Sequence, residues 1–170
     1  IRDASDQFST YNANTGVDLS VSYTFADCGD IPVIPGTPEK TMDIAESHIS
    51  EILNAGAMPI MLGGDHSTTI ACVRAFAKKY KNPGLVLIDS HFDTAQDVGG
   101  QILSHCCPVS RAVDAGFDPA KIAIIGVNGW LNPKNELDYA RDHGITVFPI
   151  EQIIEEGAKA VGEQARAVIG

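Results

Sequence analysis

Apolar positions along the chain follow two different spacings. Residues 38–55 and 67–80 carry apolar side chains three and four positions apart, which predicts amphipathic helices. Residues 58–62 and 84–89 are instead short, continuous apolar runs of the kind found in buried strands. By the same reasoning and by β-branched and aromatic content, further strands are predicted at 20–26, 121–126 and 145–148, and further helices at about 109–115, 133–142 and 150–169.

Strands separated by helices predict a parallel sheet, because parallel neighbours need a crossover connection. Helices are then expected on both faces of the sheet. The predicted fold class is α/β, a three-layer α/β/α sandwich with a mostly parallel sheet. A chain of 170 residues is long enough for one domain with a sizeable core, so residues 1–170 are expected to form a single domain.

The charge balance limits the classes of partner. A net charge of −10 argues against nucleic acid or an anionic membrane and is compatible with a small cationic substrate. No apolar run approaches the length of a membrane span, and the first residues lack the pattern of a signal peptide. A cytoplasmic location is therefore expected.

The four cysteines are interpreted as free thiols, because the composition is that of an intracellular α/β protein. They are Cys28, Cys72, Cys106 and Cys107. Adjacent Cys106 and Cys107 leave two alternatives open, a vicinal bridge and a soft metal ligand beside His105.

Residue types that bind metals follow two of the predicted strands. The run 84–89 ends in Asp89, and His91 and Asp93 follow at alternate positions, so the three side chains are expected on one side of the chain. The run 58–62 leads into Gly63-Gly64-Asp65-His66-Ser67, which adds His66. Such a mixed nitrogen and oxygen site suits Mn, Fe, Ni or Zn. Asp65 is interpreted as a supporting partner or a helix cap.

The two motifs, G-G-D-H-S at 63–67 and D-S-H-F-D at 89–93, resemble the signature pair of the ureohydrolase (arginase/agmatinase) family, whose second motif is usually D-A-H-x-D. They occur in the family's order, about one βα unit apart. The resemblance extends from Ile1–Ser5 through Asp27–Asp30 to Ile124–Gly126. It implies an arginase-like fold and a metal-dependent amidinohydrolase that cleaves a guanidino compound to urea and an amine.

The resemblance also implies two divalent metal ions, with manganese expected and nickel as the alternative. Asp89 would bridge both ions, His66 and Asp93 would bind one, and His91 the other. Two such ions lower the pKa of bound water, which supplies hydroxide for attack on a guanidinium carbon, a poor electrophile. Asp93 is also a candidate catalytic residue, placed to take the proton of the nucleophile.

His105 is the second candidate catalytic residue. In the family a histidine followed by glycine comes after the second motif and transfers a proton or orients the substrate, and Ser104-His105 resembles it. Cys106 stands where the glycine is expected, which puts the local backbone in doubt. A structural or solvent-facing His105 is the alternative.

The family takes its remaining metal ligands from a later strand bearing D-x-D, and the 170 residues contain no such motif. The sequence is therefore expected to be part of a longer protein, truncated at both ends. Alone, it should bind metal weakly and be inactive.

Three functions stay open at this point. The starting segment and the Asp-Thr end of the second motif are closest to agmatinases and guanidino-acid hydrolases such as guanidinobutyrase. The replacement of the usual sequence by His-Cys-Cys leaves open a nickel enzyme acting on guanidine, an N-alkyl guanidine or a biguanide. The third reading is a non-catalytic supporting subunit of a hetero-oligomer. The family resemblance otherwise implies a homo-oligomer, a trimer or hexamer.

Overall fold

The computed structural model describes all residues, 1–170, and contains two compact units, residues 1–30 and residues 31–170. The smaller unit has no buried residue. Its elements are α1 (Arg2–Ser5), the antiparallel pair β1 (Tyr11–Asn12) and β2 (Val17–Asp18), and α2 (Leu19–Ser22). Within this unit, the guanidinium of Arg2 pairs with Asp27 and lies 3.2 Å from Asp30. The expectation of a single domain stays a prediction.

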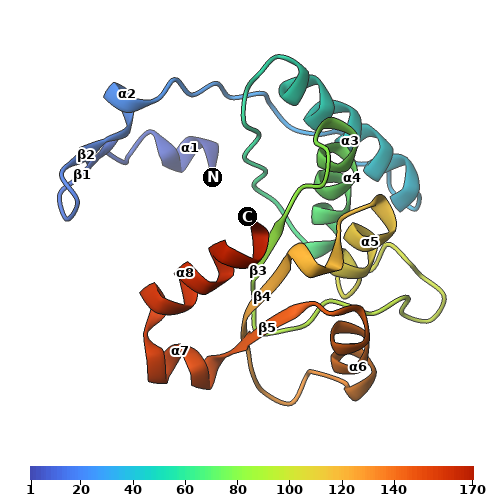
Figure 1. Cartoon of the computed structure of the whole chain (residues 1–170). Helices are drawn as coiled ribbons and strands as arrows, with labels where there is room; N and C mark the ends of the chain where they lie inside the picture. The colour runs from blue at the N-terminus through green and yellow to red at the C-terminus, as the bar shows by residue number, and fades with distance from the viewer. The chain divides into compact units, whose positions relative to one another are not determined.

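The larger unit is built on a parallel sheet with strand order β3-β4-β5 (Figure 1). The strands are β3 (Leu85–Ile88), β4 (Ile122–Val127) and β5 (Thr146–Pro149). The helices around them are α3 (Pro38–Asn54), η1 (His66–Thr68), α4 (Thr69–Lys79), α5 (Pro108–Ala115), η2 (Pro119–Lys121), α6 (Lys134–His143), α7 (Ile150–Glu156) and α8 (Ala158–Ile169). None of them combines the length and apolar character needed to cross a membrane.

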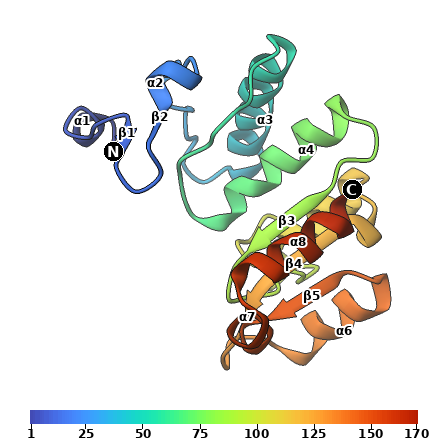
Figure 2. The same cartoon turned by 60° about the vertical axis from the view of Figure 1, so that its left-hand side comes forward.

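The side chains of β4 alternate between the two faces of the sheet, which creates two separate cores. Ile122 and Ile124 are fully buried in a cluster to which α4, α5 and α6 contribute. Ala123 faces the opposite side and packs in a cluster with Val161 and Ala165 of α8. Figures 1 and 2 show α7 and α8 on one side of the sheet and α4 and α5 on the other. The predicted three-layer α/β/α sandwich with a parallel sheet is confirmed.

Two of the predicted strands are wrong. Residues 58–62 run without strand pairing, and the side chains of Met58, Ile60 and Leu62 are exposed. Residues 20–26 are also unpaired, and their first part belongs to α2. Apolar and β-branched content suits both segments to a strand, but a strand forms only where a neighbour receives its backbone hydrogen bonds.

The predicted helix at 150–169 is two helices. Gly157 separates α7 from α8 and has φ +85° and ψ 150°, a combination outside the helical region that glycine adopts without a steric penalty. The apolar spacing continues on both sides of this break, so the pattern alone did not reveal it.

Candidate metal centre

The segment that follows β3 carries three of the predicted ligands. The backbone N–H of Asp89 donates to the carbonyl of Ile125 at 3.0 Å, so Asp89 is still held against β4. The chain then turns, and Asp93 adopts φ +50°, a left-handed conformation that is uncommon for a residue other than glycine. Its carbonyl accepts a hydrogen bond from the N–H of Val109 at 3.0 Å, which connects the turn to α5.

His66 is presented by the first turn of η1. The carboxylate of Asp65 caps this turn, accepting from the N–H of Ser67 at 3.0 Å and from the Ser67 hydroxyl. These bonds, above all the one from the hydroxyl, hold the pKa of Asp65 below its ordinary value. Asp65 is therefore the helix cap that the sequence analysis offered as one of its two interpretations.

The structure brings His66, Asp89 and Asp93 together. The Nδ1 atom of His66 contacts Oδ2 of Asp93 and lies 3.5 Å from Oδ2 of Asp89. One potential ligand atom from each residue lies within 4.8 Å of the others. The hydrogen bond with Asp93 raises the pKa of His66, and both carboxylates act in the same direction. One imidazole and two carboxylates at this spacing fit a divalent transition-metal ion.

His91 joins this group through Asp89 alone. Its Nδ1 atom lies 2.9 Å from Oδ1 of Asp89, and its backbone N–H also donates to Oδ1 at 2.9 Å. Each carboxylate oxygen of Asp89 therefore faces a different imidazole, Oδ2 facing His66 and Oδ1 facing His91. A carboxylate with this arrangement can serve two ions, one beside each histidine.

His105 lies on the segment that precedes α5, near Asp65. Its Nδ1 atom is 4.0 Å from Oδ2 of Asp65, and both side chains are mostly exposed. Cys106 does not have a positive φ, so the position where the family has glycine does not need one in this protein. Whether a glycine is needed there for close approach of the substrate is not decided by this φ, and the role of His105 stays a prediction. All four cysteines are free thiols, as expected.

Two polar residues that the sequence analysis did not single out contact the turn after β3. They are Asn132, which precedes α6, and Glu136 within α6. Glu136 is buried, with 7% of its surface exposed, and burial raises the pKa of its carboxyl. Asn132 followed by Pro133 indicates a helix start, but nothing in the spacing indicates a contact 40 residues back along the chain.

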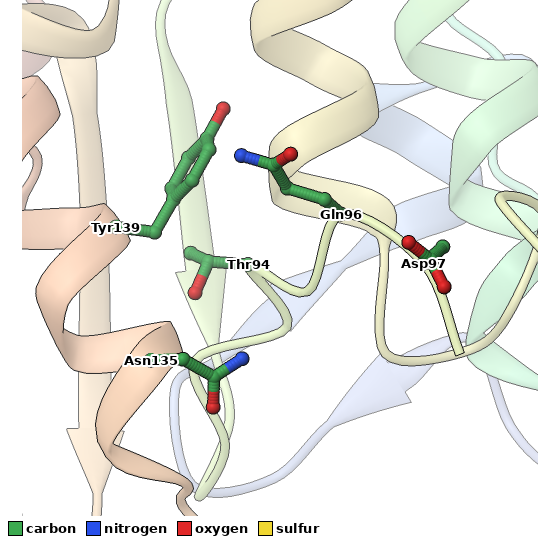
Figure 3. A pocket seen from close by; sticks show the side chains of 5 residues that line it. All are labelled: Thr94, Gln96, Asp97, Asn135 and Tyr139. Atoms are coloured by element: carbon green, nitrogen blue, oxygen red, sulfur yellow. The ribbon is translucent and has the colours of Figure 1, made fainter. Parts of the chain in front are cut away.

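A polar pocket of about 260 Å³ lies between α6 and the segment after Asp93. Figure 3 shows the side chain of Gln96 extending toward Tyr139, with Thr94 and Asn135 below them. Asp97 completes the lining. None of the four predicted metal ligands lines this pocket.

Comparison with known proteins places these features in a family context. The sequence model of the family described as the arginase family matches residues 1–170. Proclavaminate amidinohydrolase of Streptomyces clavuligerus is 37% identical over 146 residues, which are 85% of this chain and 46% of that protein. Mitochondrial agmatinase of Gallus gallus is 36% identical over 89% of this chain and 45% of its own length.

Solved structures show the same fold. The structure of the Streptomyces proclavaminate amidinohydrolase superposes with a TM-score of 0.85 at 31% identity, over 99% of this chain and 56% of that one. A Trypanosoma cruzi formiminoglutamase with Mn2+ superposes with a TM-score of 0.89 at 24% identity, over 99% of this chain and 57% of that one. The chain spans about half the length of the relatives it matches.

Proposed function

This chain belongs to the arginase family, and from that premise we propose that it carries the metal centre of an amidinohydrolase that cleaves a guanidino compound to urea and an amine. The observation that carries the proposal is the convergence of His66, Asp89 and Asp93 at the end of β3. The relatives support the reaction class, because the Streptomyces protein is named an amidinohydrolase and the Gallus protein an agmatinase.

In this proposal the site holds two divalent ions. His66, Asp89 and Asp93 would hold one ion, and Asp89 and His91 would hold the other, which agrees with the two histidines facing different oxygens of Asp89. Manganese is the expected metal, supported by the Mn2+ of the Trypanosoma relative, and nickel is the alternative because the same donors accept it. When bound, such ions supply hydroxide near neutral pH.

Residues of the chain then bind and orient the substrate and transfer protons. Asp93 accepts the proton of the attacking water on its carboxylate, and its burial keeps that carboxylate in a fixed position. Other carboxylates around the site would offset the positive charge of a guanidinium substrate. His105 is mostly exposed and lies near Asp65, the neighbour of His66, and its imidazole could transfer a proton or contact the substrate.

An agmatinase-like or guanidino-acid-hydrolase-like substrate is proposed first, since relatives of both kinds are found. A nickel enzyme for guanidine, an N-alkyl guanidine or a biguanide is the second candidate, favoured by Cys106 at the glycine position beside His105. A supporting subunit without activity is the third reading, which the intact set of His66, Asp89 and Asp93 opposes. A cytoplasmic homo-oligomer is proposed for the whole protein.

Urea release by the full-length protein tests these alternatives. The assay uses a panel of guanidino compounds with Mn2+ or Ni2+, and Asp89→Ala is expected to abolish urea release. Asp142→Ala is the matched control, because this exposed aspartate of α6 pairs only with Arg141. Urea release retained in Asp89→Ala would exclude the bridging role. A protein that binds metal and cleaves no compound of the panel would support the subunit reading.

A further inference from the structure

The turn that carries the predicted ligands has a second set of contacts on its other side. Asn132 accepts a hydrogen bond on Oδ1 from the N–H of Phe92 at 3.2 Å. Its Nδ2 donates to the carbonyl of Ser90 at 2.9 Å and to the carbonyl of Asn128 at 2.7 Å. A single amide side chain thus satisfies two backbone groups of the turn and is itself fixed by its own segment.

Glu136 continues this contact one helical turn later. Its carboxylate accepts from the N–H of Thr94 at 3.4 Å, and its backbone carbonyl accepts from the Thr94 hydroxyl at 2.8 Å. No arginine or lysine pairs with this buried carboxylate. Burying a carboxyl group without a cationic partner destabilises the fold unless the group is hydrogen-bonded. The hydrogen bond to Thr94 offsets part of this cost.

The contacts of Asn132 and Glu136 fall on every second residue of the turn. Backbone groups of Ser90, Phe92 and Thr94 are bonded to Asn132 and Glu136. The predicted ligands His91 and Asp93 lie between these residues, and Asp89 comes directly before Ser90.

Residues 89–91 form a bend and Asp93 is left-handed, so strand alternation does not set the side-chain directions here. Hydrogen bonds to backbone groups on both sides of His91 and Asp93 instead fix the course of the chain through these ligands. Asp93, with its left-handed backbone, lies between Phe92 and Thr94, whose backbone N–H groups are hydrogen-bonded to Asn132 and Glu136. These bonds stabilise the strained conformation of Asp93.

We propose that Asn132 and Glu136 are positioning residues of the metal centre, which hold the backbone of residues 90–94 so that Asp89, His91 and Asp93 converge on the metal. The proposal rests on the proposed metal-dependent function and adds two residues from a different part of the chain. Residues that orient metal ligands change metal affinity by about 10- to 100-fold when they are lost.

The test measures Mn2+ binding to the full-length protein by calorimetric titration and uses the visible spectrum of bound Co2+ as a report on ligand geometry. Asn132→Ala and Glu136→Ala are expected to raise the Kd for Mn2+ by about 10- to 100-fold and to alter the Co2+ spectrum. Glu136→Gln keeps an oxygen that accepts from Thr94, so it should restore affinity close to that of the wild type. Asn132→Asp loses the donor to Ser90 and should behave like Asn132→Ala.

Two controls come from the same segment. Asn135→Ala and Asp138→Ala change residues without bonds to the turn, since Asp138 pairs with Lys134 and Arg141, and both should leave Mn2+ binding unchanged. Thermal unfolding of each metal-free variant separates misplacement of the turn from loss of the fold. If an alanine variant does not fold, Asn132→Asp decides the question, because it keeps the size of the side chain, loses the donor to Ser90 and is expected to weaken Mn2+ binding.

The outcomes separate the two proposals. A wild-type protein that binds Mn2+ together with Asn132 and Glu136 variants that bind it equally well would overturn the positioning role alone. Glu136→Gln as weak as Glu136→Ala would also overturn it, because the charge of the carboxylate and not its hydrogen bond would then matter. A wild-type protein that binds neither Mn2+ nor Co2+ would overturn the proposed function and the positioning role together.

Discussion

Gly126 brings β4 against the backbone of a predicted ligand. Its φ is +104°, and a Cβ atom added there would lie 3.2 Å from the carbonyl oxygen of Asp89. Gly126→Ala should therefore strain the backbone and push on Asp89, lowering the free energy of unfolding by about 1–3 kcal/mol. Because the displaced residue is a predicted ligand, we expect weaker Mn2+ binding as well. Urea denaturation without metal and Mn2+ titration measure the two effects.

The matched control for this change is Gly144→Ala. Gly144 ends α6 with φ +73°, and a Cβ atom there would meet nothing within 4 Å. Gly144→Ala should lower the free energy of unfolding through the same backbone strain, yet leave Mn2+ affinity unchanged. Equal losses of Mn2+ affinity in the two variants would contradict the explanation through Asp89.

His66 gives the metal-free protein a defined pH dependence. The hydrogen bond with Asp93 raises the pKa of His66 in the folded state above its unfolded value of about 6.5. Protonation of His66 thus favours folding, and this contribution is complete below the unfolded pKa and is lost as pH rises through the folded pKa. In the presence of a chelator, the free energy of unfolding of the wild type should fall more than that of His66→Gln as pH rises from the unfolded pKa through the folded pKa of His66. Parallel plots of unfolding free energy against pH for the two proteins would refute this.

The residues differ in how far the sequence predicts them. Asp89, His91 and Asp93 were found because ligand types at alternate positions after an apolar run are a local signal. Asn132 and Glu136 were not found, because their contacts with the turn join segments about 40 residues apart. A single sequence contains no local signal for such a contact. That His91 contacts only Asp89 of the group formed by His66, Asp89 and Asp93 likewise depends on side-chain directions that spacing leaves open.

At the level of elements, β3 begins where the end of α8 passes over it. A Cβ atom on Gly84 would lie 2.6 Å from Cβ of Ile169 and 3.2 Å from its Cα, so no side-chain rotation relieves the contact. Gly84→Ala should displace the end of α8 and lower the free energy of unfolding by about 1–3 kcal/mol. Urea denaturation measures this loss.

Gly162→Ala within α8 is the control, with nothing within 4 Å of the added Cβ atom. Alanine favours helix over glycine, so this variant should gain about 0.5–1 kcal/mol. A loss of stability in Gly162→Ala similar to that in Gly84→Ala would show that α8 is sensitive to any added methyl group, and not to the close approach at Gly84.

The elements also show what hydrophobic periodicity can predict. Helices α3 to α6 and strands β3 to β5 lie where the spacing placed them, to within a few residues. Residues 58–62 have the composition of a strand but are unpaired. Whether such a segment finds a neighbouring strand cannot be predicted from the spacing of its apolar residues. The break at Gly157 is a backbone feature inside a continuous apolar pattern, which explains why one helix was predicted there.

For the whole molecule, the order of strands and helices was enough to predict the layers, because crossover connections leave few ways to arrange a parallel sheet. The order of strands within the sheet and the division at residue 30 were not predicted, since both depend on contacts between distant segments. The family was predicted from two short motifs, and the family match over residues 1–170 confirms it.

The sheet has two unpaired edges, β3 and β5, and the exposed apolar surface at the β3 edge predicts how the 170-residue chain behaves in solution. Strand β3 pairs only with β4, and the side chain of Ile88 at its end is 80% exposed. Met58, Ile60 and Leu62 add further exposed apolar surface in the same unit. An unpaired, apolar strand edge favours pairing between chains, so this polypeptide should self-associate as its concentration rises.

Ile88→Lys should suppress that association, because a charged side chain on an edge strand opposes pairing with a second copy. Ile154→Lys on α7 is the matched control, an equally exposed isoleucine away from the edge, and should leave association unchanged. Sedimentation velocity over a range of concentrations, together with binding of a hydrophobic dye, measures both variants. If the wild-type chain stays monomeric throughout, or if both lysine variants suppress association equally, the open edge of β3 is not the surface through which the copies meet.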